Sequence, residues 1–265
     1  MFWIRLRSSI ILMIATTAAV VLGGNVLFSA ILAISLIGMM ELYRIIKINK
    51  TLLAIIGYVA GILFNFLIWF QIEEYQMLFF IVFLLTLLLI YVASFPKYKV
   101  EEVSMVFFGL FYVAVMLSFI YKVRMLEDGV RLVWLIFIGA WGSDTCAYCV
   151  GMLIGKRKVF PILSPKKSLE GCIGGIVGAA FLGFVYAAIV NGKMNDINNT
   201  KIAYAVICGA SSVISQLGDL AASAIKRNHD IKDYGKLLPG HGGVLDRFDS
   251  IIFVAPIVYF LIELF

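Results

Sequence analysis

Charged residues are scarce in this chain. They make up only 14% of its 265 residues, whereas hydrophobic residues make up 62% and the mean hydropathy is +1.01. A soluble domain is usually about half apolar and about a quarter charged. The composition therefore excludes an ordinary soluble protein and predicts an integral membrane protein.

Cysteine is also sparse, and its pattern excludes a zinc site. Cys146 and Cys149 form a CxxC pair, but no second pair or histidine cluster accompanies it, as a structural zinc site requires. The other two cysteines are Cys172 and Cys208. All four fall in apolar segments that we expect to be helical, so packing inside the protein is the expected role of each.

Internal repeats and low-complexity tracts are absent as well, which argues against the repeated halves common in transporters. The net charge of +6 needs no nucleic acid to explain it. Basic loops on the cytoplasmic side of a membrane also attract anionic lipid headgroups. We therefore expect membrane lipids, and no nucleic acid, as partners of the basic loops.

Long apolar runs predict an all-α, polytopic membrane protein with about nine transmembrane helices, since roughly 20 apolar residues cross a bilayer. The runs are 8–23, 25–43, 51–70, 77–95, 103–121, 131–154, 171–190, 202–225 and 250–264. The first pair is joined by a very tight turn, "GGN". Arg5 and Arg7 precede the first run as in a secretory signal, but further spans follow at once, so we interpret it as a retained first helix.

The positive charges divide unequally across these nine spans. Lys and Arg residues on alternate sides number 17 and 5. The richer side is expected to be cytoplasmic by the positive-inside rule, with the N-terminus inside and the C-terminus outside. The two loops with the most unusual composition, 155–171 and 226–249, then face the cytosol. We expect the membrane to be the cell (inner) membrane.

The two parts of the chain differ in chemistry. Residues 1–128 are nearly pure aliphatic and aromatic spans and predict a scaffold. Residues 129–265 carry polar groups at membrane depth, where a charge is costly and usually functional. Asp144 in "WGSDTCAY" lies twelve residues before Lys156, about 18 Å along a helix. Residues 129–265 are therefore expected to form a catalytic transmembrane region with two cytoplasmic active-site loops.

Two further helices of this region have recognisable patterns. In "GASSVISQLGDLAASAIKR", Ser211, Ser215, Asp219 and Ser223 recur every four residues, which predicts one polar face turned into the bundle. The segment "GCIGGIVGAAFLG" has glycines at GxxxG spacing. This spacing permits close helix packing, and clearance for a substrate is the alternative.

The two cytoplasmic loops combine cations, glycines and acids. They are "GKRKVFPILSPKKSLEG" and "KRNHDIKDYGKLLPGHGGVLDRFD". Cationic side chains and exposed backbone N–H groups neutralise a polyphosphate. Carboxylates beside a phosphate site make sense when a divalent cation bridges the two, as magnesium does. The loops therefore indicate a site for metal and phosphate together.

The second loop resembles the C-terminal signature of the phosphatidate cytidylyltransferase (CDP-diacylglycerol synthase) family. The matching residues are Ser223, Lys226, Arg227, Lys232, Asp233, Gly235, Leu238, Pro239, His241, Gly242, Gly243, Asp246, Arg247 and Asp249. "WGSDTCAY" and "SPKKSLEG" are similar to two further family motifs, with Ser168 where many relatives have threonine. Residues 1–128 resemble the family only in being helical and apolar.

The resemblance implies a magnesium-dependent enzyme of phospholipid biosynthesis that converts CTP and phosphatidic acid to CDP-diacylglycerol and pyrophosphate. The expected catalytic residues are Asp144, Lys167, Lys226, Arg227, His241 and Arg247. The expected substrate-binding residues are Lys166, Ser168, Ser223, Lys232, Lys236, Gly242 and Gly243. The expected metal ligands are Asp219, Asp246 and Asp249. A second cation and a homodimer are left open.

Structural alternatives exist for these residues. Asp246 could pair with Arg247 or cap a helix, Asp249 could be the N-cap of the last span, and Asp144 could pair with a buried lysine. The loop cations could serve only topology, as we expect for Lys156, Arg157 and Lys158. Ser223 could bond to its own helix backbone.

Rival functions are a CTP-dependent lipid kinase, another lipid cytidylyltransferase, or a cation-coupled transporter in which Asp144 and Asp219 bind ions. The cationic Gly-rich loop argues against the transporter, which has no evident use for it.

Overall fold

The computed structural model describes residues 2–161, 163–190, 200–240 and 242–265, without the side chains of residues 2–6. The chain divides into two compact units. Unit 1 is Met1–Tyr121 with Asp233–Arg247, and unit 2 is Lys122–Lys232 with Phe248–Phe265. The boundary expected between residues 128 and 129 lies close to the first division. The Gly-rich loop, however, belongs to the unit built from the N-terminal spans.

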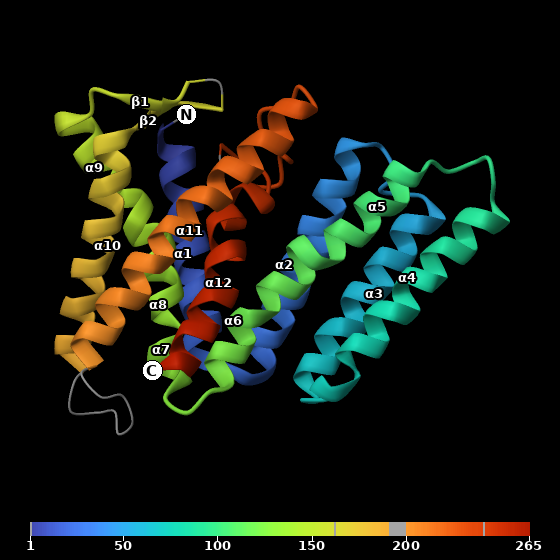
Figure 1. The fold of residues 1–265 in the computed structure, drawn as a ribbon, viewed down its shortest axis with the longest axis horizontal. Coiled ribbons are helices and arrows are strands. Elements are labelled where there is room, and N and C mark those ends of the chain that lie inside the picture. The colour runs from blue at the N-terminus through green and yellow to red at the C-terminus, as the bar shows by residue number, and fades with distance from the viewer. Residues whose placement is uncertain (1, 162, 191–199, 241) are drawn as a thin grey trace. The chain divides into compact units, whose positions relative to one another are not determined.

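Unit 1 is a bundle of antiparallel helices (Figure 1). Its elements are α1 (Phe2–Leu22), α2 (Gly24–Ile45), α3 (Leu52–Trp69), the 3-10 turn η1 (Glu73–Tyr75), α4 (Gln76–Ala93), α5 (Val100–Gly109), the π-helical η2 (Leu110–Val115) and the start of α6 (Met116–Met125). The expected tight turn between α1 and α2 is confirmed, because Gly23 and Gly24 both adopt positive φ angles, which glycine adopts without steric cost.

Tyr43 of α2 lies at the centre of this bundle. It is fully buried, and its hydroxyl donates a hydrogen bond to the carbonyl of Val106 on α5 at 2.9 Å. A Cβ at Gly57 on α3 would lie 2.8 Å from that hydroxyl. A glycine is therefore needed where α3 passes over the tyrosine.

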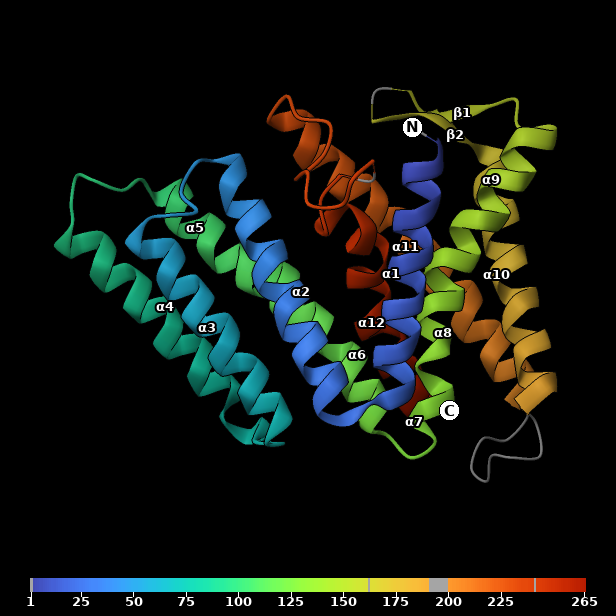
Figure 2. The same cartoon turned by 180° about the vertical axis from the view of Figure 1, so that it is seen from behind.

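Unit 2 carries the remaining helices, and Figure 2 shows them from behind. A nearly continuous helical segment is built from α7 (Gly129–Leu132), α8 (Trp134–Phe137), the π-helical η3 (Ile138–Gly142) and α9 (Ser143–Ile154). It is followed by β1 (Lys158–Phe160), β2 (Ser164–Ser168), α10 (Leu169–Val190), α11 (Thr200–Asn228) and α12 (Leu245–Leu264), whose first three residues lie in unit 1. Both views place the β1–β2 hairpin, the start of α10 and the end of α11 at the same end of this unit.

The β1–β2 hairpin is the one exception to the expected all-α fold among the named elements of the described residues. The strands are antiparallel, with Lys158 opposite Ser168 and Phe160 opposite Ser164. Sequence patterns predicted a loop here, because "SPKKS" contains a proline and lacks apolar alternation. A two-stranded ladder has only edge strands, and these tolerate Pro165.

Seven helical segments of the described chain are long and apolar enough to cross a membrane. They are Gly24–Ile45, Leu52–Trp69, Glu73–Ala93, Val100–Met125, Gly129–Ile154, Leu169–Val190 and Thr200–Asn228. The part of α1 with described side chains, Arg7–Leu22, is a shorter apolar helix, and α12 carries four charged residues over its length. The polytopic helical membrane fold is confirmed, while spans by α1 and α12 stay predictions.

The glycines of α10 serve helix packing, which confirms the expected role. A Cβ at Gly174 would lie 2.5 Å from the Cβ of Val150 on α9, and one at Gly178 would lie 2.5 Å from Cys146. A Cβ at Gly171 would lie 2.8 Å from the carbonyl oxygen of Ala147. Along these three glycines, helices α9 and α10 therefore pack so closely that no side-chain carbon fits between them.

We expect Gly174→Ala to destabilise the protein, because its methyl group would overlap Val150. Overpacking of this kind typically costs about 1–3 kcal/mol, measurable as a lower thermal unfolding temperature in detergent. Val177→Ala is the control, because Val177 is 63% exposed on the same helix. Equal unfolding temperatures for Gly174→Ala and the wild type would contradict the packing role.

Candidate active site

The polar face of α11 is turned into unit 2, as expected. Ser211 and Ser215 are fully buried, and their hydroxyls have no hydrogen-bond partner among the described residues. Ser212 is also buried, with its hydroxyl 2.6 Å from that of Ser143, the first residue of α9. This contact joins α11 to the segment that carries Asp144.

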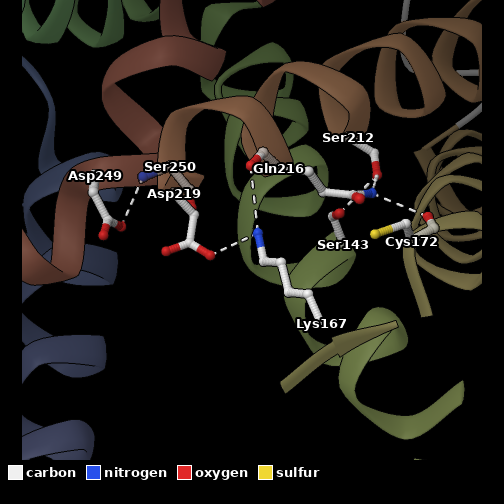
Figure 3. Close-up of polar contacts among 8 residues, drawn as sticks. All are labelled: Ser143, Lys167, Cys172, Ser212, Gln216, Asp219, Asp249 and Ser250. Carbon is white, nitrogen blue, oxygen red and sulfur yellow. Dashed lines mark hydrogen bonds and ion pairs between the residues drawn. The ribbon is translucent and has the colours of Figure 1, made fainter. Parts of the chain in front are cut away.

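Three elements meet around Lys167 (Figure 3). Its ammonium, presented by β2, lies 2.6 Å from the Asp219 carboxylate of α11 and donates a hydrogen bond to the carbonyl of Gln216 at 3.3 Å. The Gln216 side-chain amide donates to the carbonyl of Cys172 on α10 at 3.0 Å. The lysine and carboxylate expected in the site are therefore brought together, with Gln216 fastening α11 to α10 beside them.

Asp144 belongs to the same cluster. Its carboxylate is repelled by that of Asp219 and attracted by the Lys167 ammonium. The Ser250 side chain of α12 lies within hydrogen-bonding distance. The cation that interacts with Asp144 is Lys167, which is itself an expected site residue. A direct role of Asp144 in the site stays a prediction.

Asp249 completes the cluster from α12. It interacts with Asp219, Asp144 and Lys226, and Lys226 is only 9% exposed. The Asp249 carboxylate also accepts the Ser250 N–H at 2.8 Å. The alternative that Asp249 is the N-cap of the last helix is wrong, because α12 begins four residues earlier, at Leu245.

A cavity of about 430 Å³ opens beside this cluster. This volume lies within the roughly 300–1,000 Å³ typical of small-molecule sites. Its polar lining residues are Asp144, Tyr148, Lys166, Lys167, Ser168, Gln216 and Asp219. One end of unit 2 therefore holds a pocket whose walls include both cationic residues of "SPKKS".

Ser168 has a structural role at this pocket. It is 3% exposed, and its hydroxyl accepts the N–H of Gly171 at 3.2 Å in the first turn of α10. Side-chain oxygens at a helix start satisfy amides that have no partner inside the helix. The expected substrate-binding role of Ser168 stays a prediction beside this capping contact.

The Gly-rich loop is folded around Asp246 in unit 1. Asp246 is 7% exposed, and its Oδ2 accepts the backbone N–H groups of Tyr234 at 2.8 Å and Gly243 at 2.9 Å. Gly242 has a φ of 86°, which favours glycine. The Gly243 amide is therefore used inside the loop, and metal binding by Asp246 stays a prediction.

The other expected site residues take varied positions. Arg227, Lys232 and Lys236 are exposed, and Arg227 donates to the carbonyl of Ile231 at 3.2 Å. Ser223 and Arg247 are half-buried, and the Arg247 Nε has no hydrogen-bond partner among the described residues. His241 lies outside the described residues. Cys149 is exposed rather than packed, whereas Cys208 is buried as expected.

Three polar residues at these sites were missed by sequence reasoning: Gln216, Ser250 and Glu41. Gln216 precedes Asp219 by three residues on the polar face of α11, a spacing that could have identified it. Ser250 follows Asp249 directly. Glu41 belongs to an apolar helix of the part expected to be scaffold, where it is the one acidic residue of the run 25–43, and that isolated charge could have identified it.

The residues of unit 2 fit a magnesium ion in donor chemistry, although no three His, Cys, Asp or Glu side chains of the described residues converge as a preformed metal site. Magnesium in nucleotide sites is typically held by one or two carboxylates and by substrate phosphates. The cluster contains three carboxylates, those of Asp144, Asp219 and Asp249. It contains two lysines that interact with them, Lys167 and Lys226. By residue count the cluster therefore holds more carboxylates than lysines, which is the donor set that a cation needs.

The lysines and carboxylates that line the pocket of this helical membrane protein have the chemistry to bind phosphate groups and a cation. The sequence profile of the Cytidylyltransferase family matches residues 3–265. The chain belongs to this family.

Individual relatives agree with this assignment. The chain is 42% identical over 148 residues to the phosphatidate cytidylyltransferase of Bacillus subtilis (strain 168), which covers 56% of this chain and 53% of that protein. It is 37% identical over 147 residues to the phosphatidate cytidylyltransferase of Staphylococcus aureus (strain COL), covering 54% and 53%. The matched region thus spans about half the length of each of these curated relatives.

Proposed function

We propose that this protein transfers a cytidylyl group from CTP to phosphatidic acid, forming CDP-diacylglycerol and pyrophosphate. The observation that carries the proposal is the family match over residues 3–265, to which the lysine–carboxylate pocket of unit 2 adds suitable chemistry. Relatives named phosphatidate cytidylyltransferase support the choice of lipid substrate.

The reaction needs no nucleophile from the protein. A phosphate oxygen of phosphatidic acid attacks the α-phosphorus of CTP, the bond to the β-phosphate oxygen breaks, and pyrophosphate leaves. Catalysis then rests on positioning and on charge neutralisation. In our proposal Lys166 and Lys167 face the phosphates from the cavity wall, and Asp219 orients Lys167 through their 2.6 Å ion pair.

Magnesium dependence is part of the proposal. The candidate ligands remain the three carboxylates expected from the sequence, Asp219, Asp246 and Asp249. A bound magnesium would neutralise phosphate charge during transfer. We expect complete chelation of divalent cations to stop product formation.

Two differently labelled CTP preparations test the reaction. With purified protein, phosphatidic acid and magnesium, label at the α-phosphate of CTP should enter the lipid, and label at the γ-phosphate should appear in pyrophosphate. Entry of γ-label into the lipid would instead identify a lipid kinase. Cation flux in vesicles without CTP consumption would identify a transporter.

We also propose that the site faces the cytoplasm at the cell membrane, because the basic loops lie on the charge-rich side of the expected topology. Single cysteines placed at Lys166 and Lys236 in a cysteine-free background should react with an impermeant reagent only from the cytosol. One placed at Lys193, which lies outside the described residues, should react only from outside. Labelling of positions 166 and 236 from opposite sides would contradict a shared cytoplasmic face.

A further inference from the structure

Glu41 is a buried acidic residue in a helix that sequence patterns had assigned to scaffold. It lies near the end of α2 and is only 1% exposed. Acidic side chains are almost never fully buried unless they are paired. Its burial therefore requires specific partners.

These partners are backbone amides of the Gly-rich loop. One carboxylate oxygen, Oε1, accepts the N–H of Val244 at 3.1 Å, and the other, Oε2, accepts the N–H of Leu245 at 2.8 Å. Both amides belong to the start of α12, where no helical carbonyl precedes them to act as acceptor. A residue 203 positions away thus takes the place of a local helix cap.

Two glycines of the loop pack directly on the Glu41 carboxylate. A Cβ at Gly243 would lie 2.5 Å from both of its oxygens, and a Cβ at Gly235 would also overlap Oε1. A larger residue at either position would force the loop or the Glu41 carboxylate to shift. Gly243, expected from the sequence to bind substrate, and Gly235 therefore leave the space that a carboxylate of the protein itself occupies.

The loop is consequently held by two carboxylates. Glu41 of α2 accepts the N–H groups at the C-terminal end of the loop. Asp246, within the loop, accepts the N–H groups of Tyr234 and Gly243. Asp246 directly follows Leu245, one of the residues bound to Glu41. A displacement of Leu245 would therefore displace Asp246 and Arg247, for which we expect metal and phosphate contacts.

We propose that Glu41 is a positioning residue that sets the conformation of the loop Asp233–Arg247 and so the placement of Asp246 and Arg247 in the reaction. The catalytic part of this inference rests on the proposed function, whereas the loop-anchoring part does not. Glu41 acts through the loop backbone and is not expected to contact substrate. The scaffold half of the chain would then contribute directly to site geometry.

Glu41→Gln tests the proposal with little change in shape. Because both Glu41 oxygens accept backbone N–H groups, a glutamine would place its NH₂ against one of these donors. We expect kcat to fall about tenfold or more, since small misplacements of catalytic groups can reduce rates by up to about 100-fold. The KM for CTP and helical content should change little. Glu74→Gln, at an exposed residue of unit 1, is the matched control.

A second measurement does not depend on activity. Trypsin cleavage after Lys236, an exposed residue of the loop, should be several-fold faster in Glu41→Gln than in the wild type or Glu74→Gln. If the wild type makes no CDP-lipid, the proposed function fails while this comparison still tests the anchor. Wild-type cleavage and wild-type kcat in Glu41→Gln would overturn the proposal.

A double substitution tests the contact between Glu41 and Gly243 directly. Gly243→Ala should accelerate cleavage after Lys236 because its methyl group meets the Glu41 carboxylate. In the Glu41→Ala background, which lacks that carboxylate, adding Gly243→Ala should cause little further change, so the two effects should not add. Additive effects would overturn the proposal. In the wild type alone, the Val244 and Leu245 amides should exchange hydrogen slowly, and rapid exchange would also overturn it.

Discussion

Asp246→Asn is expected to lower turnover by about 100-fold or more, equivalent to about 3 kcal/mol of transition-state stabilisation. The structure makes this substitution a test of charge rather than of folding. The two loop amides described as contacts of Asp246 reach the same oxygen, Oδ2, and the single carbonyl oxygen of asparagine can take that position. Initial rates of CDP-lipid formation, with thermal unfolding in parallel, measure the effect.

Asp230→Asn is the matched control for this prediction. Asp230 is exposed and has a φ of 53°, a left-handed conformation that asparagine also adopts readily. The Asp230→Asn variant should therefore keep near wild-type turnover. If Asp246→Asn kept turnover and magnesium dependence, Asp246 would be a loop-folding residue, and the metal would be assigned to Asp219 with Asp144 or Asp249.

Lys167→Met is expected to reduce kcat/KM by about 100-fold, because it removes a phosphate-facing cation and leaves Asp219 without its partner. The stability cost should be small. The two side chains are 21% and 32% exposed, and pairs with such access to solvent contribute at most about 1 kcal/mol. Steady-state kinetics at saturating lipid, combined with unfolding temperatures, separates the two effects.

Lys158→Met provides the comparison on the same hairpin. Lys158 lies on β1, is exposed, and contacts only the carbonyl of Lys166, at 3.3 Å, among the hydrogen bonds described for its side chain. Its substitution should leave kcat/KM within about twofold of the wild type, as is usual for a surface change. Equal losses in the two variants would mean that the hairpin cations act collectively on topology or lipid attraction, and that Lys167 has no individual role.

Local patterns were sufficient for the helical membrane fold. Each expected apolar run falls in a helical segment, because the bilayer core offers no water to bind the backbone N–H and C=O groups, and a helix pairs them internally. The GxxxG spacing of α10 predicted its packing on α9, and the four-residue period of α11 predicted its buried serines. These features depend on residues three or four apart, which any single sequence displays.

Other features had no local signal. The β1–β2 hairpin forms over residues that include Pro165, and the start of α12 lies upstream of the expected span. Helix starts depend on what satisfies the first amides, and here the acceptor is Glu41, from another helix. No pattern near Leu245 could reveal it.

The sequence by itself determined the membrane character of the protein, the residue types of its site and the family to which it belongs, because composition, periodicity and motif spacing are properties of the chain. Only the tertiary structure decided which of those residues meet. In the structure, Lys167 pairs with Asp219 and binds the carbonyl of Gln216, and the Glu41 carboxylate packs against Gly235 and Gly243. The physical reason is that buried charges and amides require partners, and such partners are supplied by helices far apart in the chain.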